Sequence, residues 1–418
     1  MDRDDPVFSA HLRLLKHFLG TGSVEKLRPI VLGAPNAFAR QLSSTVVYRD
    51  SIRSLGEDLV IRSLFPETGD PVRTIISPVL GIGLDARILP AGFLASAVLH
   101  ATIRDLPLNE ETLSPLLAGA ITQMRSIATE GVADCLVAIA FDGFTIGEPI
   151  EAPVGRLSAA TNAWPYLTSG HDTCSAEATA TLRVHIGSPS QADLFEDLRQ
   201  LFSLADDFRA AVVVGADAEP PIRPITKLVT IVHPYIGFIG MVSPNQNSVP
   251  MAAPRALSAV ECEIALAALR TISKPLTTNI AIAFSRILSA IADRASPADK
   301  LIDAVTAWEN LVGTSSETSF RVCAAMAYLL EPAAELRHET LRSLRRIYQI
   351  RSKVVHGEQV PADAVRDASV AAIQAAQGAL RCVLLRHEWL VGLPTSEERA
   401  NALLLGDPRY GLPPEPSI

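Results

Sequence analysis

Residues 344–357 have the sequence LRRIYQIRSKVVHG and end a helical pattern that begins at Pro332. Arg351 and His356 are five positions apart, so on a regular helix their side chains point about 140° apart and do not share a face. They converge only if the helix ends or bends here, or if a second copy of the segment supplies one of them. Gly357 favours an end, because glycine readily adopts the left-handed conformation that closes a helix.

His356 is the candidate acid or base of this stretch. In the last turn the helix dipole favours a protonated imidazole, whereas the positive charges of Arg351 and Lys353 oppose it. An imidazole whose charge changes near neutral pH is suited to proton transfer. The sequence therefore predicts a proton-transfer site at the end of this helix.

The same helix has a basic face. Arg342, Arg346, Gln349 and Lys353 recur at helical spacing and lie on one side. Such a face can follow a phosphate backbone. The alternative interpretation is a solvated surface with no ligand.

Arg351 lies close to the apolar side of the helix, next to Leu344 and Tyr348. An arginine in that position is usually paired with a carboxylate, and Glu309 is the predicted partner. Arg321 is a second candidate partner for Glu309, and the sequence does not choose between them. The Arg351–Glu309 pair can equally be structural, with no part in chemistry.

Several segments occur in the order found in the ApeA-like group of HEPN domains. They are residues 281–304, the Trp308-Glu309 pair, the SFRV sequence at 319–322 and the 344–357 stretch. The last of these ends in RSKVVHG, which resembles the RxxxxH signature of that group. The resemblance covers about the last third of the chain and implies an all-α, HEPN-like helical bundle. Trp308 and Phe320 are then expected to make core contacts within the bundle.

This resemblance implies a metal-independent endoribonuclease site that uses no cofactor. It implies that His356 acts on the proton of the ribose 2′-hydroxyl or of the leaving oxygen, while Arg351 holds the scissile phosphate. Ser352 occupies the polar position after the arginine, where active members often have Asn, Asp or His. A 2′-hydroxyl nucleophile restricts the substrate to RNA. The expected substrate contacts are Arg342, Arg346 and Lys353, and the expected supporting residues are Glu309, Arg321 and Tyr348.

The resemblance also implies a homodimer through the C-terminal bundle and a conditional activity in prokaryotic antiviral defence or stress response. Two alternatives stay open. In one, the bundle is a non-catalytic RNA-binding or dimerisation scaffold, in which Arg351 and His356 are structural. In the other, the protein is a ligand sensor whose active part is the N-terminal domain.

Composition gives the broad class. The 418 residues have a net charge of −8, a hydrophobic content of 48% and a mean hydropathy of +0.24, which indicates a globular protein of two or three domains. The acidic balance argues against a general nucleic-acid coat, although it allows a local basic site. Five dispersed cysteines without metal-ligand spacing suit a reducing cytoplasm. The first ten residues lack a secretory pattern, and the apolar run at 228–242 is too short for a membrane span, so we expect a cytoplasmic protein.

The order of patterns predicts an α+β fold, with a mixed α/β domain at 1–250, a helical bundle at 256–392 and a weakly ordered tail at 393–418. Strands are predicted at 29–32, 73–76, 135–141, 180–186, 211–214 and 228–242. Helices are predicted at 9–20, 90–103, 111–129, 191–204, 258–271, 276–293, 297–312, 317–330, 332–356 and 361–391. The predicted helix starts are Ser258, Asp363 and the Ser296-Pro297 pair.

Three further patterns carry less weight. The glycines at 81–83 have the spacing of a phosphate loop, but the flanking prolines disfavour the required strand and helix. The HDTC sequence at 171–174 is more typical of a polar loop than of a metal site. Residues 381–387 also place an arginine before a histidine, but their apolar interior is typical of a packed helix.

Overall fold

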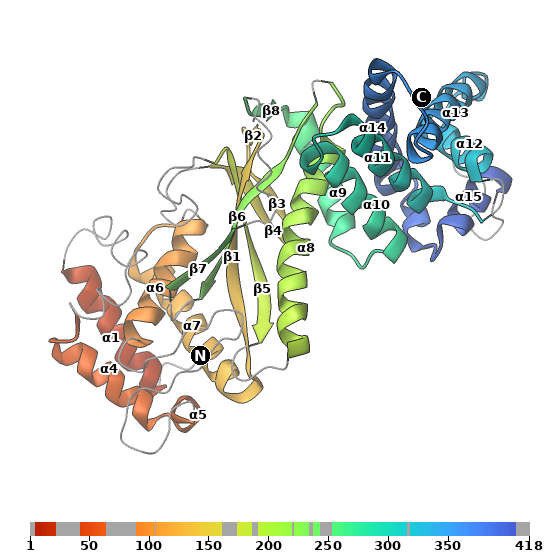
Figure 1. Ribbon diagram of the computed structural model, residues 1–418. Coiled ribbons are helices and arrows are strands. Elements are labelled where there is room, and N and C mark those ends of the chain that lie inside the picture. The colour runs from red at the N-terminus through yellow and green to blue at the C-terminus, as the bar shows by residue number, and fades with distance from the viewer. Residues whose placement is uncertain are drawn as a thin grey trace.

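The computed structural model describes residues 5–21, 42–63, 89–104, 106–160, 174–185, 191–219, 221–233, 237–242, 253–315 and 318–406. Helices and an antiparallel sheet form the N-terminal part, and helices form the C-terminal part (Figure 1). The predicted α+β fold, with a mixed part followed by a helical part, is confirmed at this level.

The N-terminal helices lie at the far end of the molecule from the C-terminal helices (Figure 1). They are α1 (Pro6–Gly20), α4 (Val46–Glu57), α5 (Leu59–Arg62), α6 (Leu89–Ile103) and α7 (Glu110–Glu130). The carboxylates of Asp5 and Asp58 accept hydrogen bonds from the first turns of α1 and α5. Arg125 of α7 forms an ion pair of 2.7 Å with each of them. One guanidinium therefore holds the starts of two helices against a third.

The sheet has the strand order β3-β4-β5-β1-β6-β7, and all neighbouring strands are antiparallel. The strands are β1 (Val132–Asp142), β3 (Ile150–Ala152), β4 (Gly155–Ala159), β5 (Ala176–His185), β6 (Ile225–His233) and β7 (Gly237–Val242). A separate parallel pair consists of β2 (Phe144–Ile146) and β8 (Arg255–Leu257). The strands predicted at 135–141 and 180–186 correspond to β1 and β5, whereas the run predicted as one strand at 228–242 forms β6 and β7.

Helices cover both faces of the sheet. α8 (Gln191–Gly215) lies along one face, where Phe208 packs with Phe141 of β1 at a ring-centroid distance of 6.4 Å. α6 and α7 lie on the other side (Figure 1). There, Leu99 of α6 forms a small cluster with Leu136 and Ala138 of β1. The alternation of side chains along β1 thus divides its apolar residues between two helix layers.

The prediction of a strand at 211–214 is wrong, because these residues form the last turn of α8. Val212, Val213 and Val214 are completely buried. Their branched side chains favour a strand locally, but tertiary packing decides the conformation of so short a run. A Cβ added to Gly215 would lie 2.6 Å from the Cβ of Ala265 in the next helix, so glycine permits this close approach.

The C-terminal helices occur near the predicted positions. They are α9 (Ala259–Ile272), α10 (Thr278–Leu288), the π-helical turn η1 (Ser289–Asp293), α11 (Pro297–Val312), α12 (Thr318–Leu330), α13 (Arg337–Val355), α14 (Ala362–Leu385), the 3-10 turn η2 (Glu388–Gly392) and α15 (Ser396–Leu405). Ser258 caps α9 in a capping box with Glu261, and Ser296 caps α11, as predicted. Asp363 is not a cap. Pro361 precedes the first residue of α14, and Asp363 lies within its first turn.

Side chains of α14 bind the C-terminal end of α8. Gln377 donates hydrogen bonds to the carbonyl groups of Val213 (2.7 Å) and Ala216 (2.6 Å). Arg381 donates three more, of 2.6 to 2.9 Å, to the carbonyl groups of residues 214–216. The last carbonyl groups of a helix have no partner within it, and here α14 supplies the donors. A single hydrophobic core continues across this contact.

Residues 396–405 differ from the predicted weakly ordered tail, because they form α15. Arg399 of α15 is fully buried and donates hydrogen bonds of 2.7 to 2.9 Å to the carbonyl groups of Leu311, Leu393 and Asn310. Burial lowers the pKa of Arg399 to about 10. The side chain is still charged at neutral pH. The contacts that order α15 are made with distant residues, which local sequence patterns do not show.

In the described part of the chain, α14 is the one helix that is long and apolar enough to cross a membrane by length and composition. Of its apolar window, 56% is buried inside the protein. It contacts α8, α9, α11, α12 and α13. The apolar surface of α14 is therefore used as core of the helical part.

Some predicted features lie outside the described residues. They are the strands at 29–32 and 73–76, the glycines at 81–83, most of the 171–174 sequence, most of the domain boundary near 250 and the end of the tail after residue 406. They stay predictions.

Replacing Arg381 by methionine is expected to lower the free energy of unfolding by about 2–4 kcal/mol, because the buried carbonyl groups at the end of α8 lose charged donors. Urea unfolding followed by circular dichroism measures this loss. The matched control is Arg366→Met on the same helix. Arg366 is 61% exposed and pairs with surface carboxylates, so its loss should cost less than about 1 kcal/mol. Equal losses in the two variants would contradict the role given to Arg381.

Candidate functional site

α13 ends in a Schellman motif at the predicted position. The N–H of Gly357 bonds to the carbonyl of Val354 at 3.1 Å, and the N–H of Glu358 bonds to that of Lys353 at 3.0 Å. Gly357 has a φ of +73°, the left-handed conformation that this motif requires. His356 is the last residue before the turn. The predicted end of the helix at Gly357 is confirmed.

Arg351 is paired with the predicted carboxylate. Its Nη2 lies 3.4 Å from Oε2 of Glu309, and the two side chains are 21% and 25% exposed. The guanidinium carbon lies 5.9 Å from the ring centroid of Tyr348. The Nε of Arg351 is buried and has no hydrogen-bond partner among the described residues. Only part of the donor capacity of Arg351 is therefore used within the chain.

Tyr348 completes this group of three side chains. Its hydroxyl donates a hydrogen bond of 2.7 Å to Oε1 of Glu309, the carboxylate oxygen that Arg351 does not use. Burial and the bond to the negatively charged Glu309 raise the pKa of Tyr348 above its ordinary value. Both oxygens of Glu309 thus have a donor from α13, and the carboxylate fixes α13 against α11.

The structure chooses between the two arginines that the sequence offered to Glu309. Arg321 bonds to the side-chain oxygen of Asn401 in α15, while Arg351 takes the carboxylate. α15 also lines an open depression beside Glu309. The sequence did not predict this depression, because it predicted the segment that forms α15 as a weakly ordered tail. The residues of α15 and its cap at this depression are Thr395, Ser396 and Glu397.

The two aromatic residues of the resemblance have different environments. Trp308 is fully buried, and its Nε1 donates a hydrogen bond of 3.1 Å to the carbonyl of Ala372 in α14. Phe320 is 48% exposed, so its predicted place in the core was wrong. Phe320 lies near the start of α12, and Val322, two residues later, is the side chain that packs in the core.

His356 is exposed and lies one residue beyond the helix. No hydrogen bond or ion pair joins its side chain to Arg351 or to any other residue that the structure describes. Ser352 is half-buried, and its carbonyl accepts the backbone N–H of His356 at 3.0 Å. The structure therefore leaves the imidazole of His356 open to a ligand, and the single chain does not bring Arg351 and His356 into contact.

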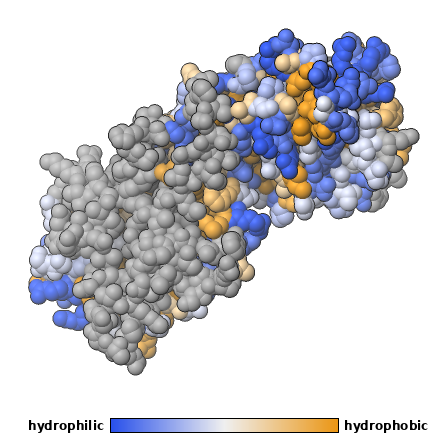
Figure 2. All heavy atoms as spheres, viewed as in Figure 1, coloured by the Kyte–Doolittle hydropathy of each residue, from blue (hydrophilic) through white to orange (hydrophobic). Residues whose placement is uncertain are grey.

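The basic face of α13 is open to solvent. Arg342, Arg346 and Lys353 are exposed, and none of them forms an ion pair within the described chain. Figure 2 shows hydrophilic side chains gathered at the end of the molecule where α13 lies in Figure 1. His356 follows the last residue of α13, three positions after Lys353 of this face.

The second arginine–histidine pair has a structural role. Arg381 binds the end of α8, as described above, and burial lowers the pKa of His387. The prediction of a packed helix at 381–387 is confirmed as far as Leu385, where α14 ends, and is wrong for the last two residues. Among the described residues, no group of three or more His, Cys, Asp or Glu side chains has an arrangement that could hold a metal ion.

Comparison with protein-family models, with curated proteins and with solved structures found no match to this chain.

Tyr348→Phe is expected to lower the free energy of unfolding by about 1–2 kcal/mol at pH 7, because a hydrogen bond to a carboxylate is lost. The folded pKa of Tyr348 is raised, so this stabilisation is complete below the unfolded pKa of about 10 and is lost as the pH rises through the folded pKa. Urea unfolding at pH 7 and at increasing pH above 10 tests both parts.

The control is Tyr328→Phe in α12. The ring of Tyr328 contacts the guanidinium of Arg337, and this contact remains in the variant. Its stability should change by less than about 0.5 kcal/mol. A Tyr348→Phe variant as stable as the wild type, or a loss that does not diminish at high pH, would speak against the hydrogen bond to Glu309.

Proposed function

We propose that the protein is an endoribonuclease whose site lies at the C-terminal end of α13, with Arg351 and His356 as the catalytic pair. One observation carries this proposal: an exposed histidine without a partner in the described chain ends a helix whose exposed basic side chains are also unpaired. Exposed cations in a row attract a phosphate backbone. The RxxxxH resemblance assigns the same two residues to RNA cleavage.

The chemistry requires two proton transfers. When the ribose 2′-oxygen attacks the adjacent phosphorus, the hydroxyl proton goes to a base, and the bond from phosphorus to the leaving 5′-oxygen breaks as that oxygen takes a proton from an acid. His356 serves one of these roles. A second His356 from a facing copy serves the other, which is the reason to propose a homodimer through the C-terminal bundle.

Arg351 stabilises the negative charge that develops on the phosphate oxygens. Its contact with Glu309 is a single one of 3.4 Å between partly exposed side chains, which is worth on the order of 1 kcal/mol or less. A phosphate that offers two oxygens to the guanidinium forms stronger, bidentate bonds. Tyr348 keeps its hydrogen bond to Glu309, so the carboxylate retains a donor when Arg351 turns toward RNA.

The same ion pair favours a second candidate function. If Arg351 stays with Glu309, the pair only holds α13 against α11, and α13 binds RNA without cleaving it. Ser352, in place of the Asn, Asp or His of many active members, is compatible with this non-catalytic module. The two functions differ in whether bound RNA is cut.

The wider biological setting is part of the same proposal. It is a conditional activity in prokaryotic defence or stress response, in the cytoplasm, with the N-terminal part controlling the helical part. The resemblance supports the setting, and the contact between α8 and α14 supports the control.

The test is cleavage of single-stranded RNA by the full-length protein in the presence of EDTA. His356→Ala is expected to reduce the rate at least a hundredfold, because one proton transfer loses its catalyst. The melting temperature should not change, since the side chain is exposed. His338→Ala is the matched control, because His338 is an exposed histidine on the same helix. Cleavage that survives His356→Ala would contradict the proposal.

RNA binding separates the two candidates. The double variant Arg342→Gln, Arg346→Gln should bind more weakly, with a salt dependence smaller by roughly 0.7 in log–log slope for each phosphate that the protein no longer neutralises. If the wild type binds in this way but does not cleave, the non-catalytic function is correct. If it neither binds nor cleaves, both functions are wrong.

A further inference from the structure

The face of the sheet beneath α6 and α7 is polar along β5, whereas the neighbouring β1 presents Leu136 and Ala138 to α6. Thr179, Thr181 and Arg183 lie at alternate positions of β5 and border the space beneath the two helices. Thr179 is buried, whereas Thr181 and Arg183 are exposed. This part of the sheet is therefore open to solvent, and a ligand can reach its polar side chains.

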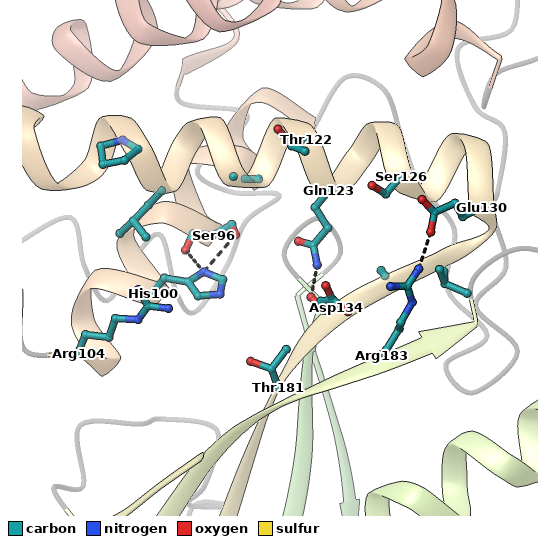
Figure 3. A pocket seen from close by; sticks show the side chains of 16 residues that line it. Ser96, His100, Arg104, Thr122, Gln123, Ser126, Glu130, Asp134, Thr181 and Arg183 are labelled. Atoms are coloured by element: carbon teal, nitrogen blue, oxygen red, sulfur yellow. Dashed lines mark hydrogen bonds and ion pairs between the residues drawn. The ribbon is translucent and has the colours of Figure 1, made fainter. Parts of the chain in front are cut away.

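α6 presents polar side chains to the same space. Its sequence, LPAGFLASAVLHATI, is almost entirely apolar. Ser96, His100 and Arg104 recur every fourth residue, which places them on one face. Figure 3 shows this face opposite Thr181 of β5. A polar stripe that runs past the C-terminal end of an otherwise apolar helix therefore lies across from the polar strand β5.

Two adjoining hollows occupy the space between these polar faces, and we call them together the sheet groove. The larger has a volume of about 470 Å³ and is bordered by α6, α7, β1 and β5. The smaller has a volume of about 360 Å³ and extends toward β3 and β4. His100, Arg104 and Thr181 border both hollows. Both volumes are typical of sites for small molecules.

His100 is prepared to accept a hydrogen bond. Its Nδ1 lies 2.8 Å from the carbonyl oxygen of Ser96, which can only accept, so Nδ1 carries the proton. Burial, and then the charge of Arg104, lower the pKa of His100, so the ring is neutral at pH 7. The free Nε2 is then an acceptor. It points away from Ser96 and into the groove (Figure 3).

Charges are separated along the groove. The Arg183–Glu130 ion pair and the carboxylate of Asp134 lie toward one end (Figure 3). Arg104 lies toward the other end and forms no ion pair within the described residues. Arg156 of β4, which is paired with a glutamate of β3, adds a second cation to the smaller hollow. A ligand that fits has an anionic group near Arg104 and neutral polar groups elsewhere.

We propose that the sheet groove binds a small phosphorylated polyol, with its phosphate at Arg104. Hydroxyl groups both donate and accept, so they can donate to the Nε2 of His100 and to Asp134, and accept from Thr181. A phosphate suits the fork of N–H donors on an arginine. This proposal is independent of the ribonuclease function.

Isothermal titration calorimetry of the full-length protein tests it, with ribose 5-phosphate as the probe. Ribose lacks the anion and inorganic phosphate lacks the hydroxyl groups, so each should bind at least tenfold more weakly than the probe. Arg104→Gln should weaken the binding of ribose 5-phosphate at least tenfold without lowering the melting temperature, because Arg104 is exposed. No binding of ribose 5-phosphate at millimolar concentration would overturn the proposal.

A second variant fills the groove. A Cβ added to Gly119 of α7 meets nothing within 4 Å, and the helix neighbours Pro115, Leu116, Thr122 and Gln123 all border the larger hollow. Gly119→Leu should therefore abolish binding, with a melting temperature that is unchanged or higher, since leucine favours a helix over glycine.

The matched control is Gly56→Leu in α4, where an added Cβ also meets nothing within 4 Å and the residue does not border the groove. This variant should bind ribose 5-phosphate as the wild type does. Undiminished binding by Gly119→Leu, or equal losses in both glycine variants, would overturn the place given to the ligand.

Discussion

The hydrogen bonds from Gln377 and Arg381 to the last turn of α8 join the sheet to the helical part. α8 lies along the sheet, and its C-terminal end lies against α9 and α14 (Figure 1). Burying this valine-rich turn removes its carbonyl groups from water, which costs free energy for each group left unpaired. A guanidinium suits the position, because it offers several N–H donors in a fixed fork and its positive charge interacts favourably with the helix dipole. The apolar burial and the polar contact therefore depend on each other.

Two other arginines also donate hydrogen bonds to backbone carbonyl groups. Arg399 binds the carbonyl groups at the end of α11, and Arg223 donates hydrogen bonds of 2.6 and 3.0 Å to the carbonyl of Ala292 in η1. These arginines are engaged with the backbone inside the protein. The arginines of the basic face of α13 are exposed and unpaired within the described residues. This contrast singles out α13 in a protein whose net charge is −8, because exposed positive charges on one helix face create a locally positive potential.

Local signals were sufficient for part of the fold and of the site. The end of α13 at Gly357 and the start of α9 at Ser258 follow from the conformational freedom of glycine and from capping by a hydroxyl, which involve only nearby residues. The end of α8 was mistaken for a strand because its consecutive valines favour a strand locally, whereas the contacts that hold it as a helix end, such as those of Arg381, come from far along the chain. α15 was not predicted for a similar reason, because Arg399 orders it through hydrogen bonds to residues far along the chain. The sheet groove was also missed, because the sequence does not show that the polar stripe of α6 lies opposite β5.

The end of α8 contacts α14, the helix that packs on α13, and so joins the N-terminal part to the helix that carries the candidate site. Hydrogen exchange of the full-length protein, followed by mass spectrometry at increasing denaturant, tests this joint most directly. If α8 and α14 open as one unit, amides in the last turn of α8 and in the middle of α14 will exchange with the same free energy and lose protection together. If the last turn of α8 exchanges at a free energy more than about 2 kcal/mol lower than α14, the two parts open separately, and the joint does not hold them as one structure.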